Sequence, residues 1–225
     1  MDTKLNEFNS WLTENCSNYI SMIGEGSVAT DDYWIENRSD YDIFVIFDGD
    51  YRKEFNKVHN YLISSNFDDN YKFSVYALKD YLKSTNCPKD FSSKFRSKVL
   101  FGKDIIENKS IPSHEMTFEM FLDGLKNTVL DLESNILSSS FWGLRKVRDV
   151  FWELYKRTFM YLAIKIYYDT GTFPCSRGDV AKALSSNELR QTLNILNKID
   201  SIEKEKIILN SENLFKYLKK LEVNK

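Results

Sequence analysis

The chain has 225 residues, and its 31 lysines and arginines nearly balance its 33 aspartates and glutamates, which gives a formal net charge of −2. A hydrophobic content of 42% excludes a disordered chain, and the length fits one large domain or two small ones. The near-neutral charge argues against a protein built mainly to hold nucleic acid. Three widely spaced cysteines and two histidines suggest neither a disulfide scaffold nor a histidine-rich metal centre.

Targeting signals are not expected in this sequence. The first ten residues carry charges and no apolar segment of the kind found in a signal peptide. No stretch approaches the roughly 18 consecutive apolar residues that a membrane-spanning helix needs. We therefore expect a cytoplasmic protein that does not enter the membrane.

The first half of the chain alternates helical and strand patterns. The spacing of Leu5, Phe8 and Leu12 predicts a helix, and Phe55 and Val58 belong to a second segment with helical spacing. The short apolar runs 19–23, 42–47 and 72–78 predict strands. The order helix, strand, loop, strand, helix, strand implies a small sheet covered by helices.

The second half, after about residue 112, shows only helical patterns. We expect helices over 114–137, 141–168, 186–198 and 201–221. Gly171 follows the long aromatic-rich helix as a terminator, and Ser176 with Asp179 has the pattern of a helix start. The sequence therefore predicts an α+β protein with a sheet-containing domain at 1–112 and an all-α helical bundle at 113–225.

Two glycines stand one residue apart in a chain that has only 8, and the second begins a Gly26-Ser27 turn directly after a predicted strand. Such a turn can bring backbone N–H groups and a hydroxyl close to a phosphate, because glycine has no Cβ. Asp40 and Asp42 then open the next apolar strand, where residues two apart share a face. Mg²⁺ takes one or two carboxylates together with phosphate oxygens. Either motif alone is more often structural or solvated; their combination indicates a nucleotide site.

This combination resembles the signature of the DNA polymerase β-type nucleotidyltransferase superfamily, Gly-Ser followed by Asp-h-Asp-h, where h is apolar. Within it the chain is most similar to antibiotic nucleotidyltransferases of the aminoglycoside-modifying kind. The segment 99–104 (Val-Leu-Phe-Gly-Lys-Asp) also resembles one that follows the sheet in these enzymes. The resemblance implies a mixed sheet flanked by helices, followed by the helical bundle.

The resemblance also implies roles for four residues. Gly26 and Ser27 would hold the triphosphate of a nucleoside triphosphate, with ATP as the expected co-substrate, while Asp40 and Asp42 would bind Mg²⁺. A hydroxyl of a small molecule, such as an aminoglycoside-type antibiotic, would attack the α-phosphorus and expel pyrophosphate. The protein could act as a homodimer. A polynucleotide or protein acceptor is a further alternative, although the near-neutral charge disfavours nucleic acid.

One position departs from the family pattern. Relatives carry a third carboxylate on a later strand, and the matching position here is Ser74, which cannot act as a carboxylate base. Asp80, Asp68 or Asp69 could substitute, or the enzyme could work with two carboxylates and a weaker base. The remaining alternative is a protein that has lost catalysis and acts as a nucleotide-binding, regulatory or antitoxin-type partner.

Overall fold

A computed structural model describes residues 3–30, 40–85, 89–112, 127, 134, 144–183 and 206 of the chain. The chain divides into two compact units, Met1–Ser113 and His114–Lys225. Each unit is described by itself below.

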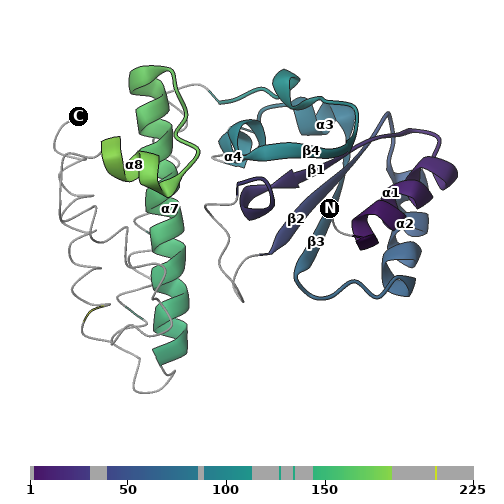
Figure 1. Ribbon diagram of the computed structural model, residues 1–225, viewed down its shortest axis with the longest axis horizontal. Helices are drawn as coiled ribbons and strands as arrows, with labels where there is room; N and C mark the ends of the chain where they lie inside the picture. The colour runs from purple at the N-terminus through teal and green to yellow at the C-terminus, as the bar shows by residue number, and fades with distance from the viewer. Residues whose placement is uncertain are drawn as a thin grey trace. The chain divides into compact units, whose positions relative to one another are not determined.

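The first unit is built on a four-stranded mixed sheet in the order β3-β2-β1-β4 (Figure 1). The central strands β1 (Tyr19–Glu25) and β2 (Tyr41–Phe47) are antiparallel, and β3 (Tyr71–Ala77) runs parallel to β2. These three strands confirm the three predicted from the sequence, with β1 extending two residues further than expected.

The fourth strand, β4 (Ser97–Gly102), corrects the sequence prediction, which placed the segment 99–104 after the sheet. β4 pairs antiparallel with β1 and forms an edge of the sheet. Gly102 has a φ of +84°, and a Cβ there would lie 2.2 Å from the carbonyl oxygen of Ile20. This glycine is therefore required by the close approach of β4 to β1.

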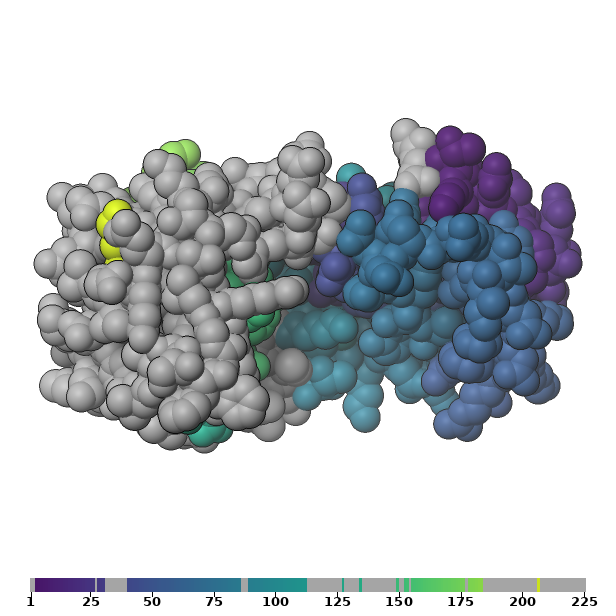
Figure 2. Space-filling model, turned by 90° about the horizontal axis from the view of Figure 1, so that it is seen from below, coloured from purple at the N-terminus to yellow at the C-terminus, as the bar shows by residue number. Residues whose placement is uncertain are grey.

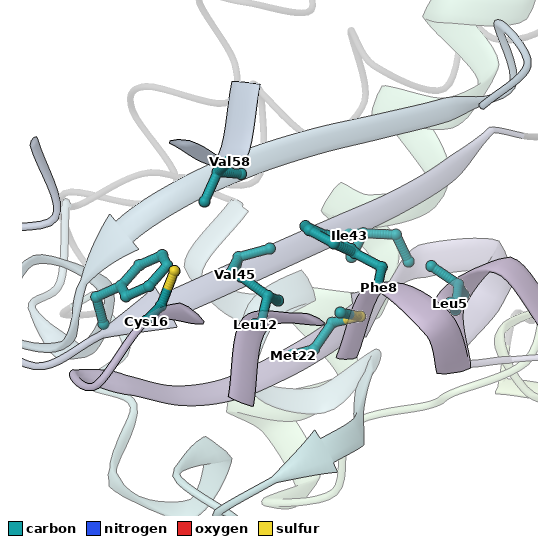
Figure 3. Packing of buried hydrophobic residues seen from close by; sticks show 9 residues of the cluster. Leu5, Phe8, Leu12, Cys16, Met22, Ile43, Val45 and Val58 are labelled. Carbon is teal, nitrogen blue, oxygen red and sulfur yellow. The ribbon is translucent and has the colours of Figure 1, made fainter. Parts of the chain in front are cut away.

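One face of the sheet is covered by the helices α1 (Thr3–Asn15) and α2 (Arg52–Ser64), which confirms both predicted helices (Figure 1). Their inward side chains and those of β1 and β2 form the core cluster drawn in Figure 3, which comprises Leu5, Phe8, Leu12, Cys16, Met22, Ile43, Val45, Phe47 and Val58. The outer sides of α1 (purple) and α2 (blue) form part of the surface of this unit (Figure 2). We call this side of the sheet the apolar face.

The opposite face carries a smaller cluster, formed by Ile23, Phe44, Ile46, Tyr81 and Ile105. Tyr81 comes from the short helix α3 (Leu78–Leu82), and α4 (Lys89–Phe95) follows it in the chain. Neither the extent of α4 nor its place beside this face was predicted from the sequence. We call this side the polar face, because the candidate site residues lie at its edge.

A buried ion pair fixes α4 to the segment that follows β4. Lys109 Nζ lies 2.6 Å from Asp90 Oδ1, and both side chains are only 4% exposed. The second carboxylate oxygen of Asp90 accepts hydrogen bonds from the backbone N–H of Thr85 at 2.7 Å and from the Ser84 hydroxyl at 3.0 Å. Burial alone would raise the pKa of Asp90, but the hydrogen bonds from Lys109, Thr85 and Ser84 outweigh it and lower the pKa.

The described part of the second unit is helical, as expected. The long helix α7 spans Leu144–Thr170, and Gly171 ends it with a φ of +74° and an N–H that donates to Tyr167 O. The helix α8 (Arg177–Ala183) begins after Ser176, whose hydroxyl accepts from the Asp179 N–H at 2.9 Å and confirms the predicted cap. The helices expected over 114–137, 186–198 and 201–221 lie outside the described residues.

In the part of the chain that the structure describes, no helix is both long and apolar enough to cross a membrane.

Candidate active site

The two predicted metal-binding aspartates lie where β2 begins. Asp40 directly precedes the strand and Asp42 is its second residue, and both are exposed. Side chains alternate along the strand, so that Phe44 and Ile46 belong to the polar face while Ile43 and Val45 belong to the apolar face. Asp42 therefore lies on the polar face, at the end of the strand where the apolar packing stops.

The predicted Gly-Ser turn lies beside these aspartates. β1 ends at Glu25, and a single 3₁₀ turn, Gly26–Val28, follows it. Gly26 has a φ of +69°, and a Cβ at this position would lie 4.0 Å from Asp42 Oδ2. The structure thus brings the turn and Asp42 together, although they are far apart in the sequence.

The hydrogen bonds of Gly26 refine its predicted role. Its N–H donates to the carbonyl oxygen of Arg96 at 2.8 Å, and its carbonyl oxygen accepts from the N–H groups of Ala29 and Thr30 at 3.1 Å. The Gly26 N–H is therefore used within the fold. Gly26 has a positive φ and lies beside Asp42, and the side chain of Ser27 lies outside the described part of the structure.

A third carboxylate, which the sequence analysis missed, lies directly across from Asp42. Glu25 is the register partner of Asp42 in the antiparallel β1–β2 pair, where opposite side chains share a face and lie about 5 Å apart at Cβ. Glu25 is only 6% exposed, and its Oε2 accepts a hydrogen bond of 2.8 Å from the hydroxyl of Ser93 in α4.

The surroundings of Glu25 act on its charge in opposite directions. Burial raises the pKa of the Glu25 carboxyl, and the nearby Asp42 raises it further. The hydrogen bond from Ser93 and the charge of Lys89 favour the ionised form, but burial prevails. The only feature of the sequence that marks Glu25 is its position between two glycines at the end of an apolar strand. Its pairing with Asp42 follows from the strand register and not from the local sequence.

Ser74, which the sequence analysis matched to the third acid of the family pattern, lies in β3. Ser74 is the register partner of Phe44 and therefore lies on the polar face, one pleat along from Asp42. The register partner of Asp42 itself is Lys72, whose ammonium group donates to the carbonyl oxygen of Asp69 at 2.8 Å.

The three substitute acids proposed from the sequence lie at opposite ends of β3. Asp80 lies in α3, beyond the far end of the strand, about 20 Å along it from the edge that holds Asp42. Asp68 and Asp69 precede the strand and lie at the same edge as Asp40, because Tyr41 and Tyr71 are register partners. Even so, no group of three acidic, histidine or cysteine side chains suited to a metal ion occurs among the described residues.

Comparison with known proteins supports the fold. No family model matches the sequence, and no curated protein matches it. Among solved structures, the chain resembles the crystal structure of spectinomycin adenyltransferase AAD(9) from Enterococcus faecialis with ATP and spectinomycin. The TM-score is 0.54 over 96% of this chain and 98% of that chain, at 13% sequence identity. The chain therefore has the fold of a DNA polymerase β-like nucleotidyltransferase, which confirms the predicted resemblance at the level of the fold.

Proposed function

We propose that the protein is a nucleotidyltransferase that moves a nucleoside monophosphate from a nucleoside triphosphate to a hydroxyl of a small molecule. One observation carries the proposal: the Gly26 turn at the end of β1 lies against Asp42 at the beginning of β2. A phosphate approach next to an exposed carboxylate is what attack on a triphosphate requires. The fold shared with an adenyltransferase crystallised with ATP and spectinomycin supports ATP as the donor and an aminoglycoside-type antibiotic as the acceptor.

The residues present fit a Mg²⁺ ion. Asp40 and Asp42 offer exposed carboxylate oxygens from one strand end, which are the donors that Mg²⁺ prefers. Two carboxylates do not complete a coordination shell, so that phosphate oxygens of the nucleotide and water would supply the other ligands. When bound, Mg²⁺ neutralises charge on the triphosphate and makes the α-phosphorus a better electrophile.

The chain would then act by positioning the two substrates. Ser27 and the backbone beyond Gly26 would hold the phosphates, while Asp40 and Asp42 would orient the triphosphate through their cation. The acceptor oxygen forms a bond to the α-phosphorus as the bond from that phosphorus to the bridging oxygen breaks. Pyrophosphate leaves with the electron pair, and the hydroxyl proton passes to a base or to water.

The test is pyrophosphate release by the purified chain with Mg²⁺, each of ATP, GTP, CTP and UTP, and a panel of aminoglycosides and spectinomycin. We expect release with one nucleotide and at least one acceptor. Asp42→Asn should reduce the rate at least about hundredfold, because a metal-binding carboxylate is lost. Asp48→Asn is the matched control, because Asp48 is an exposed aspartate just past the opposite end of the same strand. Full activity of Asp42→Asn would overturn the assignment.

A second candidate function is nucleotide binding without transfer, as a regulatory or antitoxin-type partner protein. Ser74 favours it, because the position on the polar face beside Phe44 lacks an acid. The same experiment separates the two candidates when nucleotide binding is measured beside turnover. Tight, Mg²⁺-dependent binding with no pyrophosphate release across the acceptor panel would favour the second.

A further inference from the structure

We propose that Lys89, at the beginning of α4, binds the phosphates of the nucleoside triphosphate. The proposal rests on the proposed function, since it concerns how the same site holds its nucleotide. Nothing in the sequence singles out this lysine. The packing of its side chain on the sheet does.

The contact between Lys89 and Phe44 places the ammonium group on the polar face. Lys89 Nζ lies 4.9 Å from the centre of the Phe44 ring. Phe44 follows Asp42 by two residues in β2, so that both side chains project from the same face, about 7 Å apart along the strand. The ammonium group thus lies over the side chain that follows Asp42 on this face of the strand.

The helix that carries Lys89 is held in place at three points. The Ser93 hydroxyl donates to Glu25 Oε2 at 2.8 Å, which ties α4 to the end of β1. The buried pair of Asp90 and Lys109 holds the first turn of the helix. The carbonyl oxygen of Arg96, the residue after the helix, accepts the N–H of Gly26. These contacts fix the position of the backbone that carries Lys89 against the sheet.

The negative charges on the polar face would also be balanced by a cationic side chain near Asp42. Glu25, Asp40 and Asp42 gather carboxylates at one sheet edge, and a triphosphate adds further negative charge. Lys72, which lies on the same face, already donates to the carbonyl oxygen of Asp69. Lys89 is exposed, and it takes part in no ion pair with the carboxylates that the structure describes. Its positive charge favours the ionised form of Glu25 and so opposes the rise that burial causes in the Glu25 pKa.

The experiment measures the affinity of the full chain for each nucleoside triphosphate with Mg²⁺, by isothermal titration calorimetry, for the wild type and three variants. Lys89→Met removes the charge and keeps most of the side-chain length. Lys89→Arg keeps the charge. Lys98→Met is the matched control. Lys98 is an exposed lysine on β4 and the register partner of Gly24, which directly precedes Glu25 in β1. Lys98 therefore lies on the opposite face of the sheet from Glu25.

We expect Lys89→Met to weaken binding of the triphosphate about tenfold, the loss of one charge-assisted phosphate contact. The affinity of Lys89→Arg for the triphosphate should stay within about threefold of the wild-type value, because the charge is kept. The affinity of Lys98→Met should equal that of the wild type. The loss in Lys89→Met should shrink at high salt, because screening weakens the contact in the wild type. Thermal unfolding of each variant establishes that it is folded.

Two results would overturn the proposal. If the wild type binds a triphosphate and folded Lys89→Met binds it equally well, Lys89 only balances the charge of Glu25, and the proposed function stands without this inference. The same holds if Lys89→Met and Lys98→Met weaken binding equally. If the wild type binds none of the four triphosphates, the proposed function itself fails and the inference fails with it.

Discussion

The two faces of the same sheet are built on different principles. The apolar face buries aromatic and aliphatic side chains against α1 and α2, and Phe8 alone stacks or packs edge-on against Trp11, Tyr61, Phe67 and Phe73. The polar face has a smaller apolar cluster, and toward the edge where β2 begins it carries Glu25, Asp42 and Ser74 instead. One face holds the fold together, while the other gives up apolar burial to hold charges. Truncation of a buried apolar side chain should therefore destabilise the fold, whereas removal of the buried charge of Glu25 should stabilise it.

The largest expected effect on stability is on the apolar face. Phe8 is fully buried, and Phe8→Ala should lower the free energy of unfolding by about 4 kcal/mol, the loss of ring burial together with a cavity. Urea unfolding measures this change. Phe55→Ala is the control, since Phe55 is 47% exposed on α2, and it should cost about 0.5 kcal/mol or less. Equal losses in the two variants would mean that the apolar face is not the main core.

The next effect concerns the charged groups that carry structure on the side of α4. Lys109→Met leaves Asp90 buried without its cation and should cost about 3 kcal/mol. The double variant Asp90→Asn with Lys109→Met should recover most of the loss, because no unpaired charge remains. A double variant as unstable as the single one would show that Lys109 stabilises the fold through packing and not through its charge.

The same pair predicts a pH dependence. The pKa of Asp90 is lowered in the folded state, so that its contribution to stability is fully present above the ordinary pKa of an aspartic acid. The contribution is lost as the pH falls through the folded value. Urea unfolding between pH 7 and pH 3 should show a steeper acid loss in the wild type than in the double variant. Parallel curves would contradict the assignment.

The smallest expected change has the opposite sign. Burial raises the pKa of Glu25, so that its ionised form opposes folding at neutral pH, and this penalty disappears as the pH falls below its ordinary pKa. Glu25→Gln keeps a hydrogen-bond acceptor for Ser93 and removes the charge. We expect a higher urea midpoint for Glu25→Gln at pH 8 and a smaller difference at pH 5. Glu14→Gln, an exposed position on α1, should change neither midpoint. A Glu25→Gln variant less stable than the wild type at pH 8 would show that the carboxylate stabilises the fold.

The sequence predicted the apolar face well, because periodicity reports directly on burial. The spacing of Leu5, Phe8 and Leu12 and the apolar run after Asp42 were enough to place α1 and β2. β4 was missed because it follows a short helix that was not predicted, and because its residues 99–102 were assigned by likeness to a family segment. A short strand is stabilised mainly by pairing with its neighbour in the sheet, so its own sequence identifies it poorly. The neighbour of β4 is β1, which lies some 75 residues earlier in the chain.

The candidate site was predicted only where one segment contains the pattern. Asp40 and Asp42 are two residues apart, and their shared strand was recognisable from the sequence. Glu25 reaches Asp42 through strand register, and Lys89 reaches Phe44 through helix packing, which no local pattern encodes. The assignment of Ser74 to the position of the third acid came from the resemblance alone. The β2–β3 register adds that Ser74 pairs with Phe44, which a local pattern does not show.

The proposed function requires that a cation and a nucleotide bind where β2 begins. The most direct measurement is a crystal structure of the chain with a non-hydrolysable ATP analogue and Mn²⁺, with the ion located by its anomalous signal. We predict an Mn²⁺ peak coordinated by carboxylate oxygens of Asp40 and Asp42 and by phosphate oxygens of the analogue, absent in Asp42→Asn. An analogue bound with its phosphates away from Gly26, or with no ion at these aspartates, would contradict the proposed function.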